Sequence, residues 1–126
     1  MKKQVSSGTS WENIVGYSRA VRVNNIIEVA GTTAVDGDTI VGKNDVYAQT
    51  IFILKKIEAS LEILGSSLKE VVRTRMFVTD ISQWELIGKA HGTFFKDIKP
   101  VTTMVQVNKL IDPDLLVEIE ATAIIE

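Results

Sequence analysis

The sequence predicts a two-layer α+β domain in which two helices cover one face of a single mixed sheet. Five segments show the alternation and the β-branched residues that are typical of strands, and they cover residues 19–23, 26–31, 71–79, 101–107 and 116–123. Two longer segments place apolar residues at helical spacing, and they cover residues 44–64 and 82–95. With a short strand at residues 39–41, the order is three strands, a helix, a strand, a helix and two strands.

The beginning of the chain predicts a hairpin that follows an irregular arm. Residues 1–12 are polar and rich in serine, so we expect an irregular N-terminal arm there. Asn24 and Asn25 separate the first two strands, and they suit a tight turn because asparagine tolerates a positive φ. A second turn at residues 36–38 leads into the short strand.

Each predicted helix has recognisable end signals. The pair Asn44-Asp45 can cap the first helix, and Gly65 stands where a helix C-terminus favours a positive φ. Ser82 and Glu85 match a capping box at the start of the second helix. Pro100 prevents further helix and opens the penultimate strand.

The composition narrows the classes of function. The 126 residues fit one domain spanning residues 1–126, and a net charge of −2 without a basic block argues against nucleic acid as a partner. The chain has no cysteine and one histidine, which argues against a thiolate nucleophile and a metal site. No window approaches the roughly 20 apolar residues that span a bilayer, so we expect no membrane partner and a cytoplasmic location.

Alternation along residues 71–79 distributes the side chains between the two faces of the sheet. We expect four side chains of this strand to point toward the helices: Val72, Thr74, Met76 and Val78. Arg73 and Arg75 then point to the opposite face, where the alternation of the last strand also places Glu118 and Glu120. Because buried charges must be paired, these arginines and glutamates are expected to meet.

The face opposite the helices is expected to need a partner. Its expected apolar patch comprises Val71, Phe77, Met104 and Ile124. A contiguous patch of this kind is too apolar for water, so we expect a homo-oligomer that covers it.

Short motifs along almost the whole chain resemble the Rid (YjgF) family. Gly16-Tyr17-Ser18-Arg19-Ala20-Val21 resembles the Tyr-Ser-X-Ala-Val opening of that family, and Val29-Ala30-Gly31 resembles its Val-Ser-Gly strand end. Val78-Thr79-Asp80 leads into the second helix as in the family, and Glu118-Ile119-Glu120-Ala121 closes the match. Each motif is weak alone, but their order and spacing are specific.

The resemblance implies a chorismate-mutase-like fold and a homotrimer with three clefts between subunits. It implies no metal and no organic cofactor. It also implies a small ligand that bears a carboxylate, and a reaction in which water attacks the C=N carbon of an imine or enamine acid, releasing ammonia. Tyr17 and Glu120 match the tyrosine and glutamate that assist this hydrolysis, and Gly31 matches the ligand-binding strand end.

Three positions depart from the family pattern. Thr102 occupies the position where the resemblance implies the arginine that binds the substrate carboxylate. Ala30 occupies a position where the family usually has a serine, and Gly88 one where it usually has an asparagine. A threonine offers a hydroxyl but no charge, whereas a bidentate grip on a carboxylate is specific to guanidinium. The chain is therefore identified as a member of a branch that lacks the catalytic arginine, with low or altered activity.

Two interpretations of the arginines stay open. Arg73 or Arg75 can pair with Glu118 or Glu120 in a structural network, or Arg75 can replace the missing guanidinium and bind the ligand. The function stays open as well. The alternatives to an imine or enamine deaminase are a non-enzymatic binding or regulatory module and, with less support, a ribonuclease or translation inhibitor.

Overall fold

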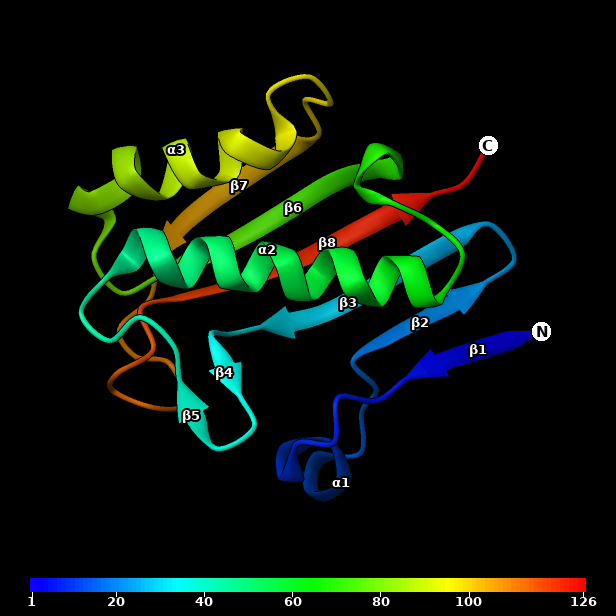
Figure 1. Cartoon of the computed structure of the whole chain (residues 1–126), viewed down its shortest axis with the longest axis horizontal. Coiled ribbons are helices and arrows are strands. Elements are labelled where there is room, and N and C mark those ends of the chain that lie inside the picture. The colour runs from blue at the N-terminus through cyan, green and yellow to red at the C-terminus, as the bar shows by residue number, and fades with distance from the viewer.

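The computed structural model describes all residues from Met1 to Glu126, and it contains a six-stranded mixed sheet in the order β1-β2-β3-β8-β6-β7 (Figure 1). The strands are β1 (Lys2–Val5), β2 (Ala20–Val23), β3 (Ile26–Thr32), β6 (Val71–Val78), β7 (Val101–Gln106) and β8 (Val117–Ile124). Strands β6 and β7 pair in parallel, whereas the other neighbours are antiparallel. A small separate hairpin joins β4 (Val35–Asp36) to β5 (Thr39–Ile40).

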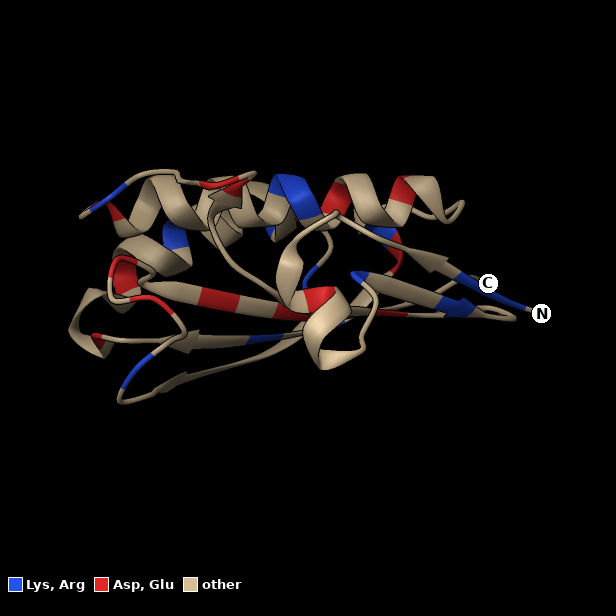
Figure 2. Cartoon of the chain, turned by 90° about the horizontal axis from the view of Figure 1, so that it is seen from below, with Lys and Arg blue, Asp and Glu red and all other residues tan.

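Two long helices, α2 (Val46–Ile63) and α3 (Trp84–Phe95), lie side by side on one face of the sheet (Figure 2). The opposite face carries no long helix, as Figure 2 also shows. The predicted α+β class, the mixed sheet and the two covering helices are thus confirmed. A short helix, α1 (Ser10–Val15), lies beside the sheet, and no helix is both long and apolar enough to cross a membrane.

The core lies between the two long helices and the sheet. The buried face of α2 carries Ile53, Leu54, Ile57 and Leu61, all fully inaccessible to solvent. Burying each side chain of this kind contributes roughly 1.5–3 kcal/mol. Asp45 caps α2 by accepting a hydrogen bond from the amide of Ala48, and Gly65 follows the helix with a φ of 82°.

The expectation of an irregular arm over residues 1–12 is wrong. β1 pairs with β2, and α1 follows after a short loop. The carboxylate of Glu12 organises this loop by accepting hydrogen bonds from Ser6, Ser7 and Thr9. Burial alone would raise the pKa of Glu12, but these hydrogen bonds together hold it below its usual value. The strand was missed because β1 is mostly polar, so its pairing with β2 leaves little pattern in its own side chains.

The predicted capping box is also wrong. Ser82 lies in the turn before α3 and its hydroxyl donates to the carboxylate of Asp80, and no side-chain cap is made at the start of α3. Asp80 instead caps a 3-10 turn over Ile81–Gln83, which precedes α3, and Gln83 at the start of α3 makes no side-chain cap.

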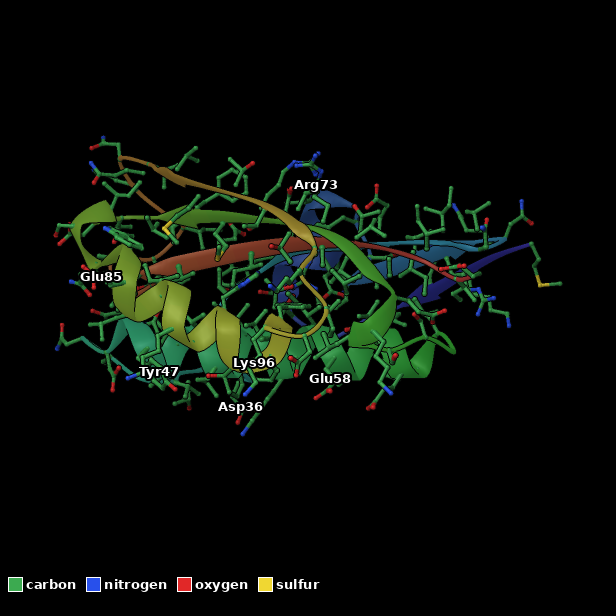
Figure 3. The ribbon with its side chains drawn as sticks, turned by 90° about the horizontal axis from the view of Figure 1, so that it is seen from above. Asp36, Tyr47, Glu58, Arg73, Glu85 and Lys96 are labelled. Carbon is green, nitrogen blue, oxygen red and sulfur yellow. The ribbon has the colours of Figure 1, made fainter.

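A β-bulge between Val71 and Arg73 changes which side chains face the helices. Thr74, Met76 and Val78 are buried as predicted, but Val71 is buried in place of Val72, which is 41% exposed. A bulge sets two residues against one and breaks strict alternation. Arg73 projects from the sheet away from the helices, in contrast to Tyr47 and Glu58 of α2 (Figure 3).

The face opposite the helices, called the open face below, differs in part from the predicted apolar patch. Val71 and Met104 lie on the helix side, because Val71 is buried and Met104 pairs with the buried Met76. Phe77 and Ile124 remain on the open face, where they align with Glu118 and Ile26. By the same register, the exposed apolar side chains of this face include Val23, Ile26, Val101 and Val105.

Candidate functional site

A hollow of about 560 Å³ lies on the open face, and we call it the sheet pocket. It brings together four of the predicted site residues. Tyr17 comes from the loop between α1 and β2, Ala30 from β3, Arg75 from β6 and Glu120 from β8. These positions are far apart in the sequence, and the pairing of β8 with both β3 and β6 makes them neighbours.

Arg75 and Glu120 face each other across β6 and β8 in the sheet pocket. The Arg75 Nη1 and Glu120 Oε1 atoms are 3.6 Å apart, and both side chains remain 39–49% exposed. An ion pair this long and this open to water contributes little to stability, about 0–1 kcal/mol. The groups therefore stay available to a ligand or to a second copy of the chain.

The polar wall of the sheet pocket includes a second carboxylate. Glu28 and Thr122 both line the hollow, and the Thr122 hydroxyl donates a hydrogen bond to Glu28. With the Tyr17 phenol, the pocket offers groups that can accept, donate and place protons around a small polar molecule.

Three other predicted site residues lie outside the sheet pocket. Arg73 is on the open face beside Thr122 but makes no ion pair. Thr102 lies on β7, and Gly88 lies on α3 with open space where a Cβ would stand. Within one chain, neither Thr102 nor Gly88 meets Tyr17, Arg75 or Glu120 in a shared hollow.

Thr102 instead belongs to a chain of hydrogen bonds on the helix side. The Thr74 hydroxyl donates to Thr102 Oγ1 at 2.7 Å, and Thr74 Oγ1 lies 2.9 Å from His91 Nε2. The His91 tautomer sets which of Nε2 and Thr74 Oγ1 donates in the second of these bonds. Burial lowers the pKa of His91, whose ring also packs against Phe95 with 4.6 Å between the ring centroids.

A second hollow, of about 140 Å³, lies beside the sheet pocket and contains Gly31. We call it the arginine pocket, and the residues that define it here are Trp11, Tyr17, Arg19, Gly31, Lys56 and Glu118. Tyr17 lines both hollows. Gly31 lies close against Glu118, since a Cβ at this position would lie 2.6 Å from Glu118 Oε2 unless that side chain moved.

The arginine pocket holds three ionisable groups that sequence analysis did not select as site residues. Arg19 is 5% exposed, and its Nη2 donates to the Gly31 carbonyl at 2.5 Å. Lys56 Nζ donates to the Val35 carbonyl at 2.9 Å. Glu118 was expected only as an ion-pair partner for Arg73 or Arg75, and it makes neither pair.

Burial changes the acidity of two of these groups. Burial raises the pKa of Glu118, and the nearby Glu120 adds to this effect while Arg19 opposes it. Burial lowers the pKa of Lys56, and the charge of Arg19 acts in the same direction, while Glu12 and Asp36 oppose it. Groups with perturbed pKa values in a hollow are typical of functional sites. The one available sequence signal was Arg19 itself, a charge placed directly before the apolar strand β2.

No group of three or more potential metal-ligating side chains comes together in the structure. The fold and the hollows thus define a small α+β domain with two adjoining polar pockets, one of them on an exposed sheet face. The chain belongs to the Rid (YjgF) family, because residues 8–125 match the family described as Endoribonuclease L-PSP. The family expectation from the sequence is confirmed.

Three known proteins illustrate the similarity. The crystal structure of Rv2704 from Mycobacterium tuberculosis, of the YjgF/YER057c/UK114 family, has a TM-score of 0.91 and 48% identity, covering 99% of this chain and 100% of its own. The 3-aminoacrylate deaminase RutC of Acinetobacter baylyi is 32% identical over 108 residues, 85% of each chain. TdcF of E. coli, solved with bound serine, has a TM-score of 0.80 and 26% identity, covering 87% of this chain and 88% of its own.

Proposed function

We propose that this protein binds a small carboxylate-bearing metabolite in clefts between copies of itself and hydrolyses imine or enamine acids with low or altered activity. The observation that supports this most is the sheet pocket, where Tyr17, Arg75 and Glu120 meet. The names of two similar proteins agree with the ligand class, since 3-aminoacrylate is an enamine acid and serine carries a carboxylate.

Hydrolysis of an imine acid requires one base, one positive charge and one hydrogen-bond donor. Glu120 accepts a proton from a water molecule, whose oxygen forms a bond to the C=N carbon of the imine. That proton passes to the nitrogen and gives a carbinolamine. The proton of its new hydroxyl group then reaches the nitrogen as the C–N bond breaks and the C=O bond forms, so that ammonia and a 2-keto acid leave. Tyr17 hydrogen-bonds the reacting group, and Arg75 supplies the positive charge that holds the carboxylate.

A homotrimer would complete the site. Val101 and Val105 are exposed on the open face at 56% and 41%, which favours burial against another copy. Thr102 and Gly88 do not line the sheet pocket of their own chain, so they reach such a site only across an interface between copies. Because Thr102 brings no charge, the activity is expected to be low.

A non-enzymatic binding or regulatory module is the second candidate function. It is favoured by the contact between Arg75 and Glu120, which engages the proposed cation and the proposed base with each other. Ribonuclease activity has weaker support, since a net charge of −2 does not favour a nucleic-acid partner.

The deciding experiment measures ammonia release from 2-imino acids that an amino-acid oxidase generates in the assay. We expect slow release that exceeds spontaneous hydrolysis and that Glu120→Gln abolishes. Glu62→Gln, on the exposed side of α2, is the matched control and should leave the rate unchanged. Stabilisation by a 2-keto acid without any turnover would instead support the binding module.

A further inference from the structure

Arg19 is a buried cation that makes no ion pair. Its side chain is 5% exposed, it makes no ion pair, and its Nε is buried without any hydrogen-bond partner. Its one side-chain hydrogen bond goes to the neutral Gly31 carbonyl. A buried charge without a counter-charge is costly, and an unsatisfied buried donor adds to that cost. The site is therefore incomplete as it stands.

A second cation lies in the same hollow. Lys56 lines the arginine pocket with Arg19, and its only hydrogen bond is to the neutral Val35 carbonyl. The one acidic residue that lines the hollow is Glu118, and burial favours its neutral form. Glu12 and Asp36 also act on Lys56, but neither lines the hollow, and the Glu12 oxygens are engaged by hydroxyl and amide groups. Among the residues that line the hollow, two cations thus meet a single carboxyl group.

The size of the hollow limits the anion that it can hold. At about 140 Å³, it is well below the volume of sites for drug-sized molecules, roughly 300–1,000 Å³. A nucleotide or a sugar phosphate is too large. A planar carboxylate on a short chain fits the space and suits the planar guanidinium, whose donors are arranged to bind carboxylates.

We propose that the arginine pocket is an anion subsite, in which Arg19 and Lys56 hold the carboxylate of a short-chain acid. The inference rests on the proposed function for the ligand class, and it deepens that function by moving the carboxylate from Arg75 to Arg19 and Lys56. Tyr17 lines both hollows, so an acid held in the arginine pocket directs its next carbon toward Tyr17 and the sheet pocket. Arg75 then stays paired with Glu120. The positive charge that is absent at Thr102 is supplied instead by Arg19 and Lys56.

The test uses 2-oxobutanoate as the probe and Trp11, which lines the arginine pocket, as the reporter. Trp84 is 56% exposed on α3, so Trp84→Phe removes the only other tryptophan without opening the core. Lys56→Met removes the charge and keeps an unbranched side chain, Lys56→Arg keeps the charge, and Lys55→Met is the matched control on the exposed side of α2. These variants avoid deletion of the buried Arg19, which would threaten folding.

We expect saturable fluorescence titration by 2-oxobutanoate, weakened about tenfold by Lys56→Met, restored by Lys56→Arg and unchanged by Lys55→Met. Weakening by Arg75→Gln but not by Lys56→Met would overturn this inference and leave the proposed function standing. Absence of saturable binding in every folded variant would overturn both. Equal binding of the uncharged 2-butanone would overturn the anion subsite, because it would show that the carboxylate is not recognised.

Discussion

The hydroxyl of Thr74 donates a hydrogen bond to Thr102 across the parallel pair β6 and β7, with 2.7 Å between the oxygens. This contact fixes Thr102 on the helix side at the edge of the sheet, whereas Arg75 and Glu120 lie on the open face. The position that the family resemblance assigns to a carboxylate-binding arginine therefore belongs, within one chain, to a different surface from the sheet pocket. Cooperation between the two surfaces requires a second copy of the chain.

Thr102→Arg tests whether this edge serves a site in a neighbouring copy. The side chain is exposed on an edge strand, so an arginine has room there, and Thr74 keeps its hydrogen bond with His91 when the bond to Thr102 is lost. We expect ammonia release from 2-imino acids to rise at least tenfold, because a guanidinium that binds a carboxylate contributes about 1.5–3 kcal/mol. Thr103→Arg is the control on the adjacent position, and it should not raise the rate. Equal effects of the two variants would show that only overall charge matters.

His91 predicts how stability depends on pH. Burial lowers its pKa from 6.5 in the folded protein, so below about pH 6.5 the unfolded chain takes up the proton more readily. The contribution of neutral His91 is therefore complete above pH 6.5 and is lost as the pH falls below it. The raised pKa of Glu118 acts in the opposite direction, since protonation in acid favours the folded state.

Urea unfolding of the wild type and of His91→Gln at pH 7.5 and pH 5.5 separates these effects. The chain has one histidine, so the difference between the two proteins isolates this group. We expect the stability advantage of the wild type to shrink at pH 5.5. An advantage that stays constant across this range would contradict a depressed pKa at His91.

Gly31→Ala is expected to displace the Glu118 carboxylate. The new Cβ would lie 2.6 Å from Glu118 Oε2 and 2.9 Å from its Cδ, so the side chain must move. Crowding of this kind costs about 1–3 kcal/mol. Gly88→Ala is the matched control: nothing lies within 4 Å of its Cβ position in α3, and alanine should stabilise the helix by about 1 kcal/mol. Thermal unfolding of both variants checks these opposite signs, and destabilisation by Gly88→Ala would contradict the open environment.

The open face predicts how assembly responds to charge. Val105→Lys places an ammonium group on this face beside Phe77 and should shift the proposed homotrimer to monomers, because a buried unpaired charge is costly. Ile63→Lys, at an exposed site on α2, is the control and should leave the molar mass unchanged. Light scattering over a range of concentrations measures both. A trimer that tolerates Val105→Lys would place the contact between copies elsewhere.

The elements that could be predicted are those in which the spacing of apolar side chains indicates a helix or a strand. Alternation and helical spacing located the five longer strands and both long helices, since burial along one element is visible in its own sequence. β1 was missed because its partner, β2, lies far along the chain and supplies the hydrogen bonds. The bulge at Val71 was missed because alternation carries no mark of an inserted residue.

The same distinction holds for the sites. Parity within β6 and β8 correctly placed Arg75 and Glu120 on one face, where they contact each other. The arginine pocket could not be predicted in this way, because Arg19, Lys56 and Glu118 come from three elements that only the folded chain brings together. The sequence does not show whether a single residue such as Thr102 contributes to a site in its own chain or to one in a neighbouring copy.

The most direct test of the central claim is a crystal structure of the assembled protein grown with 2-oxobutanoate. We predict that the acid binds beside Tyr17, between two copies of the chain, with its keto carbon directed toward Glu120. A monomeric arrangement, or an acid bound away from Tyr17 with both pockets filled only by water, would contradict the claim.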